Sequence, residues 1–431
     1  MFRLIKVIIV TVLFSLFLSA CDNDKHNADI SVAAETYNGD LDAKQKPPQR
    51  INPNFLRSSG KTADPSYQIT FPFDHLPHPN FDIEWWYLTS NLKGDDGKAY
   101  SLQWTLFRFA QRNRQDDWYQ GQIYMAHASL HSQSEHWFEE RFAPAGLGNA
   151  FVEKTSAGAI ELAMDDWKWL GELKNGSLFP STLNFKIRPL VSTTLDSGAR
   201  LPAQNGETSQ VPPQASVSLK LSSIGPFILQ GQDGYSIKSA QGRHASHYYS
   251  QPFIQVDGTI HFAEQSEKPE LSIDASSTSG TVTNEVKVKG LAWYDHEWSS
   301  ALVDSETAGW DWMSLHFDNG DKLMAFQMRL SNADGESNNM SYQTGTYIYA
   351  NGDSQSLLPQ DIELSILQNQ MVAGRNMPLK WEVNIPSKAL KVIVEATKAK
   401  SYNPSIFPYY EGAVSFEGTH SGIGFLELTG Y

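Results

Sequence analysis

Alternation of apolar and polar residues is the feature that most constrains the fold of this chain. Bulky apolar residues occupy every second position in LNFKI (183–187), SVSLKL (216–221) and LKWEVNI (379–385). A period of two places all these side chains on one face of a β-strand, whereas a helix needs a period near 3.6. The turn sequences DDGK, KNG, DNGD and ANGD separate such runs. The pattern predicts an all-β, antiparallel chain, either a sandwich or a barrel, without a long amphipathic helix.

The N-terminal twenty residues have the pattern of a secretory signal. The basic MFRLIK precedes an apolar run, VIIVTVLFSLFL, which is too short to span a bilayer as a helix. LSAC follows and ends at Cys21, the only cysteine. This segment resembles a bacterial lipobox, so we predict a signal peptide over 1–20 and a lipid on Cys21; the alternative is an ordinary signal peptide with a stray cysteine. Asp22 resembles an inner-membrane retention signal, which predicts a lipid-anchored protein facing the periplasm.

The segment after Cys21 is polar and proline-bearing, as in KQKPPQRINPNF, and shows no sustained period. We therefore predict a flexible tether over residues 21–65. The rest of the 431-residue chain is too long for one ordinary core. We predict two domains, 66–250 and 251–431.

A weak internal repeat supports two related domains. Residues 84–108 and 309–329 each contain a Trp-rich strand, a turn with Asp-Gly or Asn-Gly, and a strand carrying a Gln and an Arg. The polar stretches 193–214 and 264–284 lack spaced apolar residues and are predicted to be loop insertions.

Charge and aromatic content narrow the class of partner. The formal net charge is −14, and no basic patch stands out, which argues against nucleic acid and anionic membrane surfaces as partners. Aromatic residues make up 12% of the chain, a content that suits strands and apolar ligand pockets.

The sequence GLAWYDHEWSS (290–300) holds the strongest candidate for chemistry. On a strand, Trp293, Asp295 and Glu297 would share one face. A carboxyl group packed against aromatic surface loses hydration, so its pKa rises and it can donate a proton. The alternative is structural: an Asp-His pair that locks the strand by hydrogen bonds. The opposite face would carry Tyr294, His296 and Trp298.

Two other aromatic stretches supply candidate ligand contacts. In ASHYYSQPF, His247 and Tyr249 share a strand face and could position a water, although a satisfied structural histidine is the commoner case. In FDIEWWYLTSNL, Glu84 and Trp86 share a face, and in the second copy of the repeat Trp310 opens the strand. These three residues and His296 are candidate ligand contacts; pairing of Glu84 with Arg108 or Arg329 inside a barrel is the favoured alternative.

Motifs for other chemistries are missing from the sequence. His244 and His247 have a spacing that suits a helix, yet they lie in a predicted strand, and there is no His-Glu-x-x-His motif or cysteine cluster. There is no Gly-x-Ser-x-Gly motif and no glycine-rich phosphate loop. We predict neither a metal nor a cofactor.

Four stretches carry a resemblance to a known family: EWWYLTSNL (84–92), WYDHEWSS (293–300), GWDWMSLHFDNGDKLMAFQMR (309–329) and YYEGAVSFEGTHSGIGFLELTGY (409–431). Over about residues 70–431 the chain resembles the carotenoid 1,2-hydratase and AttH family. The resemblance implies two lipocalin-like (calycin-type) antiparallel β-barrels in tandem. Its hydratases add water to an isolated double bond, whereas its exported AttH-type members are similar to accessory proteins of ABC transport systems.

The resemblance also implies roles for four residues. The acid proposed for the hydratases matches Asp295, and Trp293 stands where the hydratases have Tyr. A His-x-aromatic pair matches His247 and Tyr249, where the hydratases have Trp. Proton donation is thereby retained, while both aromatic residues differ in kind.

Three functions follow as hypotheses. The first is a lipid-anchored protein that binds a hydrophobic small molecule or lipid beside an ABC transporter permease. The alternative is a hydro-lyase that adds water to an isoprenoid-like alkene through Asp295. The third is a saccharide-binding or hydrolytic role, which would require a second carboxylate, such as Glu84 or Glu297, about 5–10 Å from Asp295.

Overall fold

A computed structural model describes residues 60–111, 121–190, 213–263, 283–303, 306–331 and 337–431. All of these residues belong to one compact unit of the chain. Apart from two three-residue 3-10 helices, η2 (Phe73–His75) and η3 (Pro386–Lys388), the regular structure described is β-strand. Within those residues, no helix has the length and apolar character needed to cross a membrane. The predicted all-β, antiparallel fold is confirmed.

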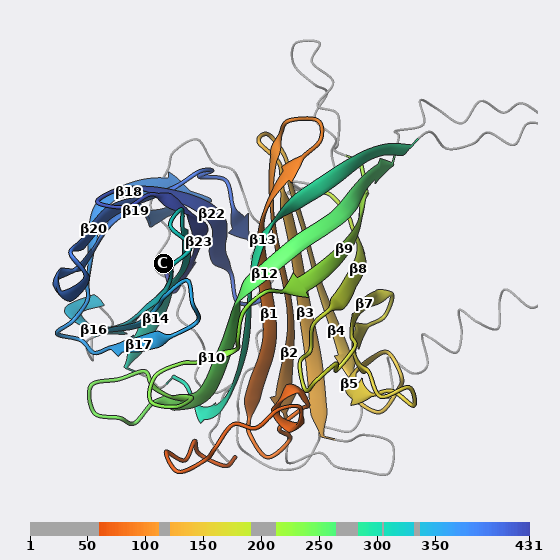
Figure 1. Ribbon diagram of the computed structural model, residues 1–431, viewed down its shortest axis with the longest axis horizontal. Coiled ribbons are helices and arrows are strands. Elements are labelled where there is room, and N and C mark those ends of the chain that lie inside the picture. Colours follow the sequence, from red (N-terminus) through yellow and green to blue (C-terminus); the bar gives the residue numbers. More distant parts are fainter. Residues whose placement is uncertain (1–59, 112–120, 191–212, 264–282, 304–305, 332–336) are drawn as a thin grey trace, which may run out of the picture. The chain divides into compact units, whose positions relative to one another are not determined.

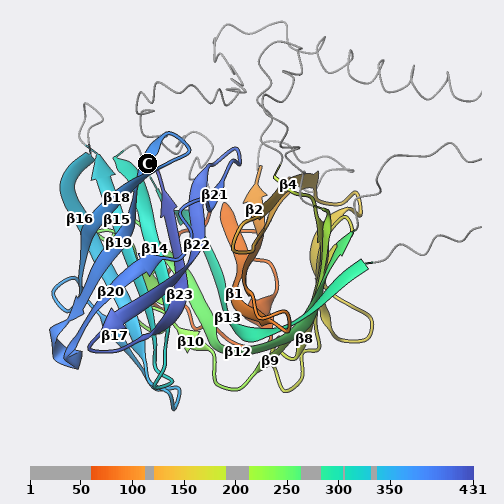
Figure 2. The ribbon, with the colours of Figure 1, turned by 90° about the horizontal axis from the view of Figure 1, so that it is seen from above.

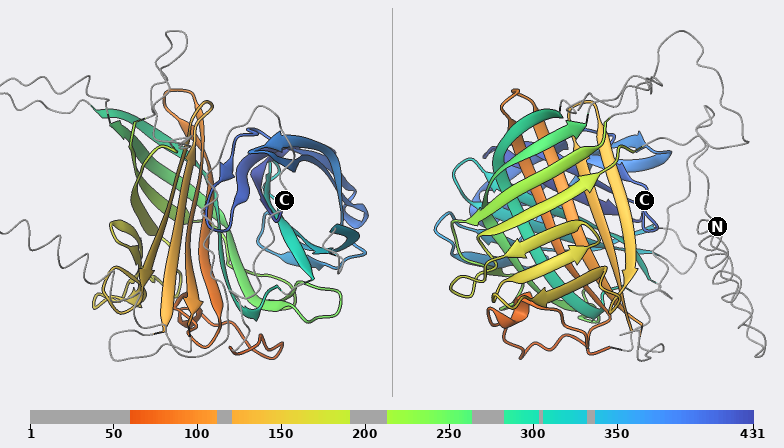
Figure 3. Two further views of the ribbon diagram at one scale, coloured as in Figure 1. Left: turned by 180° about the vertical axis from the view of Figure 1, so that it is seen from behind. Right: turned by 90° about the vertical axis from the view of Figure 1, so that its right-hand side faces the viewer.

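The first sheet has thirteen strands in the order β4-β3-β2-β1-β13-β12-β9-β8-β7-β6-β5, and β10 and β11 pair with β12. It curls on itself, as Figures 2 and 3 show, and contacts between β4 and β6 and between β3 and β8 bring its two ends together. Its strands are β1 (Ile83–Gly94), β2 (Ala99–Ala110), β3 (Gln122–His131), β4 (His136–Pro144), β5 (Ala150–Lys154), β6 (Ile160–Met164), β7 (Trp167–Gly171), β8 (Ser181–Ile187), β9 (Ala215–Ser223), β10 (Ile228–Leu229), β11 (Tyr235–Ile237), β12 (Ala245–Ala263) and β13 (Thr283–Ala301).

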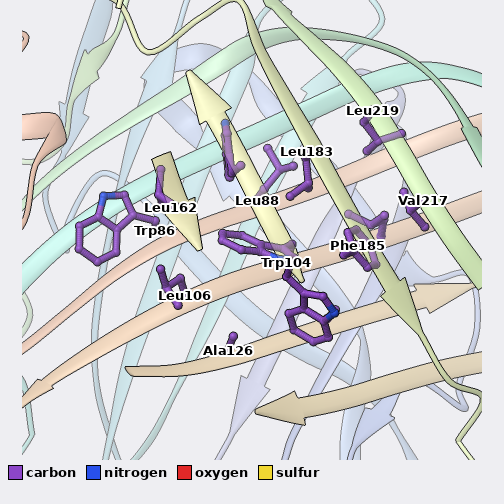
Figure 4. Close-up of a cluster of buried hydrophobic side chains, with 14 of the residues drawn as sticks. Trp86, Leu88, Trp104, Leu106, Ala126, Leu162, Leu183, Phe185, Val217 and Leu219 are labelled. Carbon is purple, nitrogen blue, oxygen red and sulfur yellow. The ribbon is translucent and has the colours of Figure 1, made fainter. Parts of the chain in front are cut away.

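The alternation of apolar and polar residues in the sequence corresponds to an alternation of buried and more exposed side chains along the strands. In β8 and β9 every second side chain is buried, as the sequence predicts. Figure 4 shows side chains from several strands of this sheet meeting in one core, among them Trp86, Trp104, Phe185 and Leu219. Removal of these surfaces from water, at roughly 25 cal/mol per Å² of apolar area, stabilises the curled sheet.

The second sheet has ten strands in the order β17-β16-β15-β14-β23-β22-β20-β19-β18, with β21 paired to β22. Figure 1 shows that this sheet also curls. Its buried apolar side chains form a separate core. Its strands are β14 (Thr307–Phe317), β15 (Lys322–Ser331), β16 (Ser337–Ile348), β17 (Ser354–Leu357), β18 (Glu363–Val372), β19 (Arg375–Ile385), β20 (Leu390–Ala396), β21 (Tyr402–Asn403), β22 (Tyr409–Gly418) and β23 (Gly422–Thr429).

The division of the chain between the sheets differs from the prediction. The predicted boundary between residues 250 and 251 falls inside β12, which continues to Ala263 and pairs with β13 of the same sheet. The first sheet therefore extends to Ala301, and the second begins at Thr307. A register shift between Gln251 and Ile254 marks a bulge at the predicted boundary. The bulge bends the strand without ending it.

The internal repeat corresponds to one hairpin in each sheet, β1–β2 and β14–β15. Glu84 of β1 accepts a hydrogen bond from Arg108 of β2 at 2.8 Å. Asp311 of β14 accepts one from Arg329 of β15 at 3.1 Å. Each copy thus buries one carboxylate–guanidinium pair, and the favoured pairing of Glu84 with Arg108 is confirmed.

The predicted tether is too long at its C-terminal end. The backbone N–H of Gly60 donates to Asp82 at 2.8 Å, and Lys61 donates to the carbonyl of Asn80 at 2.8 Å. These bonds attach residues 60–65 to the first sheet, so this part of the 21–65 prediction is wrong. The predicted signal peptide, Cys21, the remaining tether and most of both predicted insertions lie outside the described residues.

Candidate functional site

Strands β12 and β13 present two chemically different faces. On β13, Trp293, Asp295 and Glu297 share one face, as predicted from the alternation. On β12, Tyr248 contacts Asp295, whereas Tyr249 contacts His296 on the opposite face. The predicted catalytic set is therefore divided: Asp295 and Trp293 lie on one face of the sheet, and His247 and Tyr249 lie on the other.

Asp295 lies on the face directed toward the second sheet and is held by three donors. The Trp293 indole donates to Oδ1 at 2.7 Å, and the Ser250 hydroxyl donates to the same oxygen. The Tyr248 hydroxyl donates to Oδ2 at 2.8 Å and in turn accepts from the Trp312 indole at 3.3 Å. Because Oδ1 already accepts two hydrogen bonds, Oδ2 is the oxygen that can carry a proton.

Burial dominates the acidity of this group. Asp295 is 2% exposed, and loss of hydration raises its pKa to about 7. The hydrogen bonds from Ser250, Trp293 and Tyr248 favour the ionised form but do not offset burial. Asp295 is therefore poised between its acid and base forms near neutral pH, which is the condition for general acid catalysis.

A cavity of about 150 Å³ lies beside Asp295, between the outer faces of the two sheets. An apolar cavity of about this size can hold a benzene ring. Most of its wall is aromatic or aliphatic, and Ile406 at its edge is 50% exposed. The apolar lining residues are Ile83, Trp85, Phe107, Phe109, Met125, Leu302, Trp310, Trp312, Phe326, Met328, Ile406, Phe407 and Pro408.

Of the four predicted ligand contacts, only Trp310 reaches this cavity. Its indole donates to Glu427 of β23 at 2.6 Å. The cavity also includes Lys238, whose ammonium pairs with Glu297 at 2.9 Å, and Tyr87 of β1. The sequence patterns do not point to Tyr248, Ser250 and Glu427, because the relation of these residues to Asp295 and to the cavity depends on pairing between strands that are distant in sequence.

Glu84 and His296 belong instead to a buried network inside the first sheet. Glu84 Oε1 contacts His78 Nδ1 at 2.7 Å and His296 Nε2 at 2.8 Å, while its Oε2 accepts from Arg108. Burial alone would raise the pKa of Glu84, but the cationic His78 and Arg108 hold it well below its usual range. Burial alone would lower the pKa of His78, yet Glu84 and Asp74 together raise it. The network therefore keeps two carboxylates charged beside two cations.

The other inner residues pack around this network. Trp86 is fully buried, stacks on His296 with ring centroids 4.7 Å apart, and donates to the carbonyl of His75 at 3.2 Å. Tyr249 bonds to both His75, at 2.7 Å, and His296, at 2.9 Å. His247 lies with its ring centroid 5.5 Å from that of Trp298, and burial lowers its pKa to about 4. These contacts are typical of a structural role, in which the side chains stabilise the inside of the first sheet.

One cluster in the described residues has donor atoms spaced for a metal ion. His78, Glu84 and His296 each offer a ligand atom, and these atoms lie within 4.8 Å of one another. Each of them is already hydrogen-bonded, and Arg108 places a fixed positive charge on the same carboxylate. In this network the carboxylates of Asp74 and Glu84 are balanced by the cations His78 and Arg108. A divalent ion would therefore add positive charge that no further carboxylate of the network compensates.

Comparisons with known proteins agree with this architecture. A protein from Nitrosomonas europaea, assigned to AttH, has a crystal structure that matches with a TM-score of 0.64 and 26% sequence identity over 86% of this chain and 99% of that one. Kievitone hydratase from Nectria haematococca matches with a TM-score of 0.52 and 12% identity over 89% of this chain and 98% of that one, which shows a shared fold. A search of curated proteins found no match. The family model for AttH-like proteins matches residues 62–431. The chain therefore belongs to the AttH-like family.

Proposed function

We propose that this protein binds a hydrophobic alkene in the cavity between the sheets and adds water to it, with Asp295 as the acid. The observation that carries the proposal is a buried carboxyl group with a pKa of about 7 at the wall of an aromatic cavity. Protonating an isolated alkene produces a tertiary carbocation, which requires a desolvated acid and electron-rich faces to stabilise the charge. Trp310, Trp312 and Tyr248 line the same cavity and supply those faces.

The reaction balances without a cofactor. The Oδ2–H of Asp295 transfers its proton to the less substituted carbon of the double bond. A water molecule then bonds to the tertiary carbon and gives up one proton, so the alkene and one water become an alcohol. The cavity can hold an isopropylidene group, because this group is no larger than a benzene ring. We therefore propose an acyclic isoprenoid end as the substrate class.

The test uses geranylacetone, an acyclic isoprenoid ketone that ends in an isopropylidene group, incubated with the full chain in ¹⁸O-water. The wild type should form a tertiary alcohol that carries the label, and Asp295→Asn should lower the rate by at least a factor of 10³, because amide nitrogen is not an acid. Asp257→Asn, which changes an exposed aspartate of the same sheet, is the control. Equal rates in Asp295→Asn and the wild type would exclude Asp295 as the acid.

For the location of the protein, we propose a lipid on Cys21 that anchors the chain at the membrane, facing the periplasm. The lipobox-like LSAC supports this. Labelled palmitate should enter the wild type and not Cys21→Ala. Labelling of both proteins, or of neither, would contradict the proposal.

As a second role we propose that the anchored protein delivers its ligand to an ABC transporter permease. Membership of the AttH-like family supports the idea. Crosslinking in the cell should then join the chain to a permease only when Cys21 is present. Absence of that crosslink in the wild type would contradict the role while leaving the reaction at Asp295 untouched.

A further inference from the structure

A pair of glutamates lies on the second sheet, and one of them, Glu427, lines the same cavity as Asp295. Glu411 of β22 and Glu427 of β23 are register partners, so their side chains lie next to each other on one face of the second sheet. Tyr87 of β1 donates to Glu411 Oε1 at 2.7 Å. Trp310 of β14 donates to Glu427 Oε1 at 2.6 Å. Each carboxyl group thus has one oxygen held by an aromatic donor and one oxygen directed elsewhere.

The two carboxyl groups are neighbours on adjacent strands, and two ionised carboxylates placed side by side repel each other. Ionised carboxylates have only acceptors, so a single proton held between Glu411 and Glu427 would let one donate to the other. Glu411 Oε2 is buried and has no hydrogen-bond partner among the described residues. Burial raises the pKa of Glu411 well above its usual range, and Glu427 raises it further. A proton on Glu411 Oε2 that is directed at Glu427 would relieve the repulsion and give this buried oxygen a partner.

Glu427 is the member of the pair that faces the cavity. Glu411 is completely buried, whereas Glu427 is partly accessible and lines the cavity wall. Burial raises the pKa of Glu427 to about 7, while the hydrogen bond from Trp310 opposes the rise. Near neutral pH, Glu427 can therefore exist as a carboxylate that accepts a proton from a molecule in the cavity.

A second group in the cavity wall can help to hold water. Gln103 of β2 is 1% exposed and lines the same cavity. Its amide nitrogen donates to Thr105, but its Oε1 has no partner among the residues described. A buried amide oxygen without a partner is costly, so it favours a hydrogen-bonding molecule at this wall.

Tyr87 connects the glutamate pair with Asp295. It is the register partner of Asp295 on β13, and its hydroxyl bonds to Glu411 on the other sheet. Burial and Glu411 raise the pKa of Tyr87, and Glu427 and Asp295 raise it further.

We propose that Glu411 and Glu427 share one proton and form a second acid–base site, in which Glu427 takes the proton released by the water that adds to the alkene. This step rests on the proposed function of Asp295. The bond from water oxygen to the tertiary carbon forms as an O–H bond of that water breaks, and the proton passes to the Glu427 carboxylate. Asp295 gives one proton and Glu427 gains one, so return of a proton from Glu427 to Asp295, through water, completes the cycle.

The shared proton is tested by infrared spectroscopy of the full chain at neutral pH, with ¹³C in the glutamate carboxyl groups to separate them from Asp295. The wild type should show a protonated glutamate band that disappears in both Glu411→Gln and Glu427→Gln. Asp295→Asn should keep that band, and so should Glu417→Gln, which alters an exposed glutamate of β22. A wild type without the band, or a band that survives in both Gln variants, would overturn the shared proton.

The catalytic role is tested by separating protonation of the alkene from addition of water. In D₂O, reversible protonation exchanges the vinyl hydrogen of geranylacetone for deuterium, whereas ¹⁸O-water reports the complete addition. Glu427→Gln should keep deuterium exchange within about threefold and lose at least 100-fold in ¹⁸O incorporation, since loss of a general base typically costs about 10²–10⁴. Asp295→Asn should lose both reactions. A Glu427→Gln variant with full ¹⁸O incorporation would overturn the role of Glu427 alone. If the wild type performs neither reaction, both the role of Asp295 and the catalytic step assigned to Glu427 are wrong, while the infrared result still decides the shared proton.

Discussion

At the scale of single residues, Asp295 and Glu84 are both buried carboxyl groups, yet their surroundings make them opposites. Cationic His78 and Arg108 keep the pKa of Glu84 well below its usual range, although burial opposes them. Asp295 has only neutral donors, so burial prevails and its pKa rises to about 7. The sequence predicts that Asp295 shares a strand face with Trp293. It does not predict the hydrogen bonds from the hydroxyl groups of Tyr248 and Ser250, because these residues belong to another strand.

The raised pKa of Asp295 predicts a pH-dependent stability. An unfolded aspartate has a pKa near 4, so between about pH 4 and 7 the folded protein binds more protons at this site than the unfolded chain. Its contribution to stability is present at low pH and is lost as the pH rises to 7, by about 1.4 kcal/mol per pH unit at most. The free energy of unfolding of the wild type relative to Asp295→Asn should therefore fall across this window in urea titrations. A constant difference would mean that Asp295 is ionised throughout.

Breaking the inner ion pair predicts a loss of stability without a direct loss of chemistry. Arg108→Met leaves Glu84 charged and buried with fewer partners, which should cost about 3–5 kcal/mol in the free energy of unfolding. The control is Lys289→Met, since Lys289 pairs with Asp257 at an exposed site and should contribute about 0–1 kcal/mol. Equal effects of both changes in denaturant unfolding would show that the inner network does not stabilise the fold.

At the scale of strands, alternation predicted which side chains share a face, and the structure follows it in β8, β9 and β13. The repeat also identified the hairpins that carry Glu84 with Arg108 and Asp311 with Arg329. Alternation does not predict the register in which two strands that are distant in sequence pair with each other. The pairing of β1 with β13, 200 residues apart, places Tyr87 opposite Asp295, and no local pattern encodes that.

The pairing of β1 with β13 depends on a close approach at Gly290. A Cβ atom there would lie 1.9 Å from the backbone oxygen of Asn91, so Gly290→Ala must force the strands apart. We expect a loss of at least about 1–3 kcal/mol in unfolding free energy and weaker hydrogen-exchange protection along β13. Lys289→Ala, the exposed neighbour, loses only a solvent-exposed ion pair with Asp257 and should cost about 0–1 kcal/mol. Similar protection in both variants would contradict this account of the strand contact.

At the scale of the whole molecule, the two sheets share polar contacts as well as the cavity. Tyr87 bonds to Glu411, His127 bonds to Tyr409 at 2.9 Å, and Trp312 bonds to Tyr248. The sequence indicated two domains. Their interface is formed by side chains on the outward faces of the strands, and alternation alone does not show that such a face packs against another sheet. The family resemblance predicted the tandem barrels, while the position of the boundary required the strand pairing.

These shared contacts predict a single cooperative unfolding transition for the two sheets. Calorimetry of the full chain should give one peak, and Tyr87→Phe should lower its midpoint, because Glu411 loses a buried donor at a cost of about 1–3 kcal/mol. Tyr100→Phe, which removes a hydroxyl bonded to Asp96 at the tip of the β1–β2 hairpin, is the matched control. Two separate peaks, or no effect of Tyr87→Phe, would contradict coupling through this interface.

The most direct test of the central claim is native mass spectrometry of the full chain after exposure to a lipid extract rich in acyclic isoprenoids. We predict that the wild type carries one isoprenoid, released partly with the mass of one added water, and that Asp295→Asn carries the same molecule without that addition. An isoprenoid recovered unchanged from both proteins would contradict acid catalysis by Asp295 and leave binding alone. Absence of any bound hydrophobic molecule in the wild type would contradict the assignment of the cavity itself.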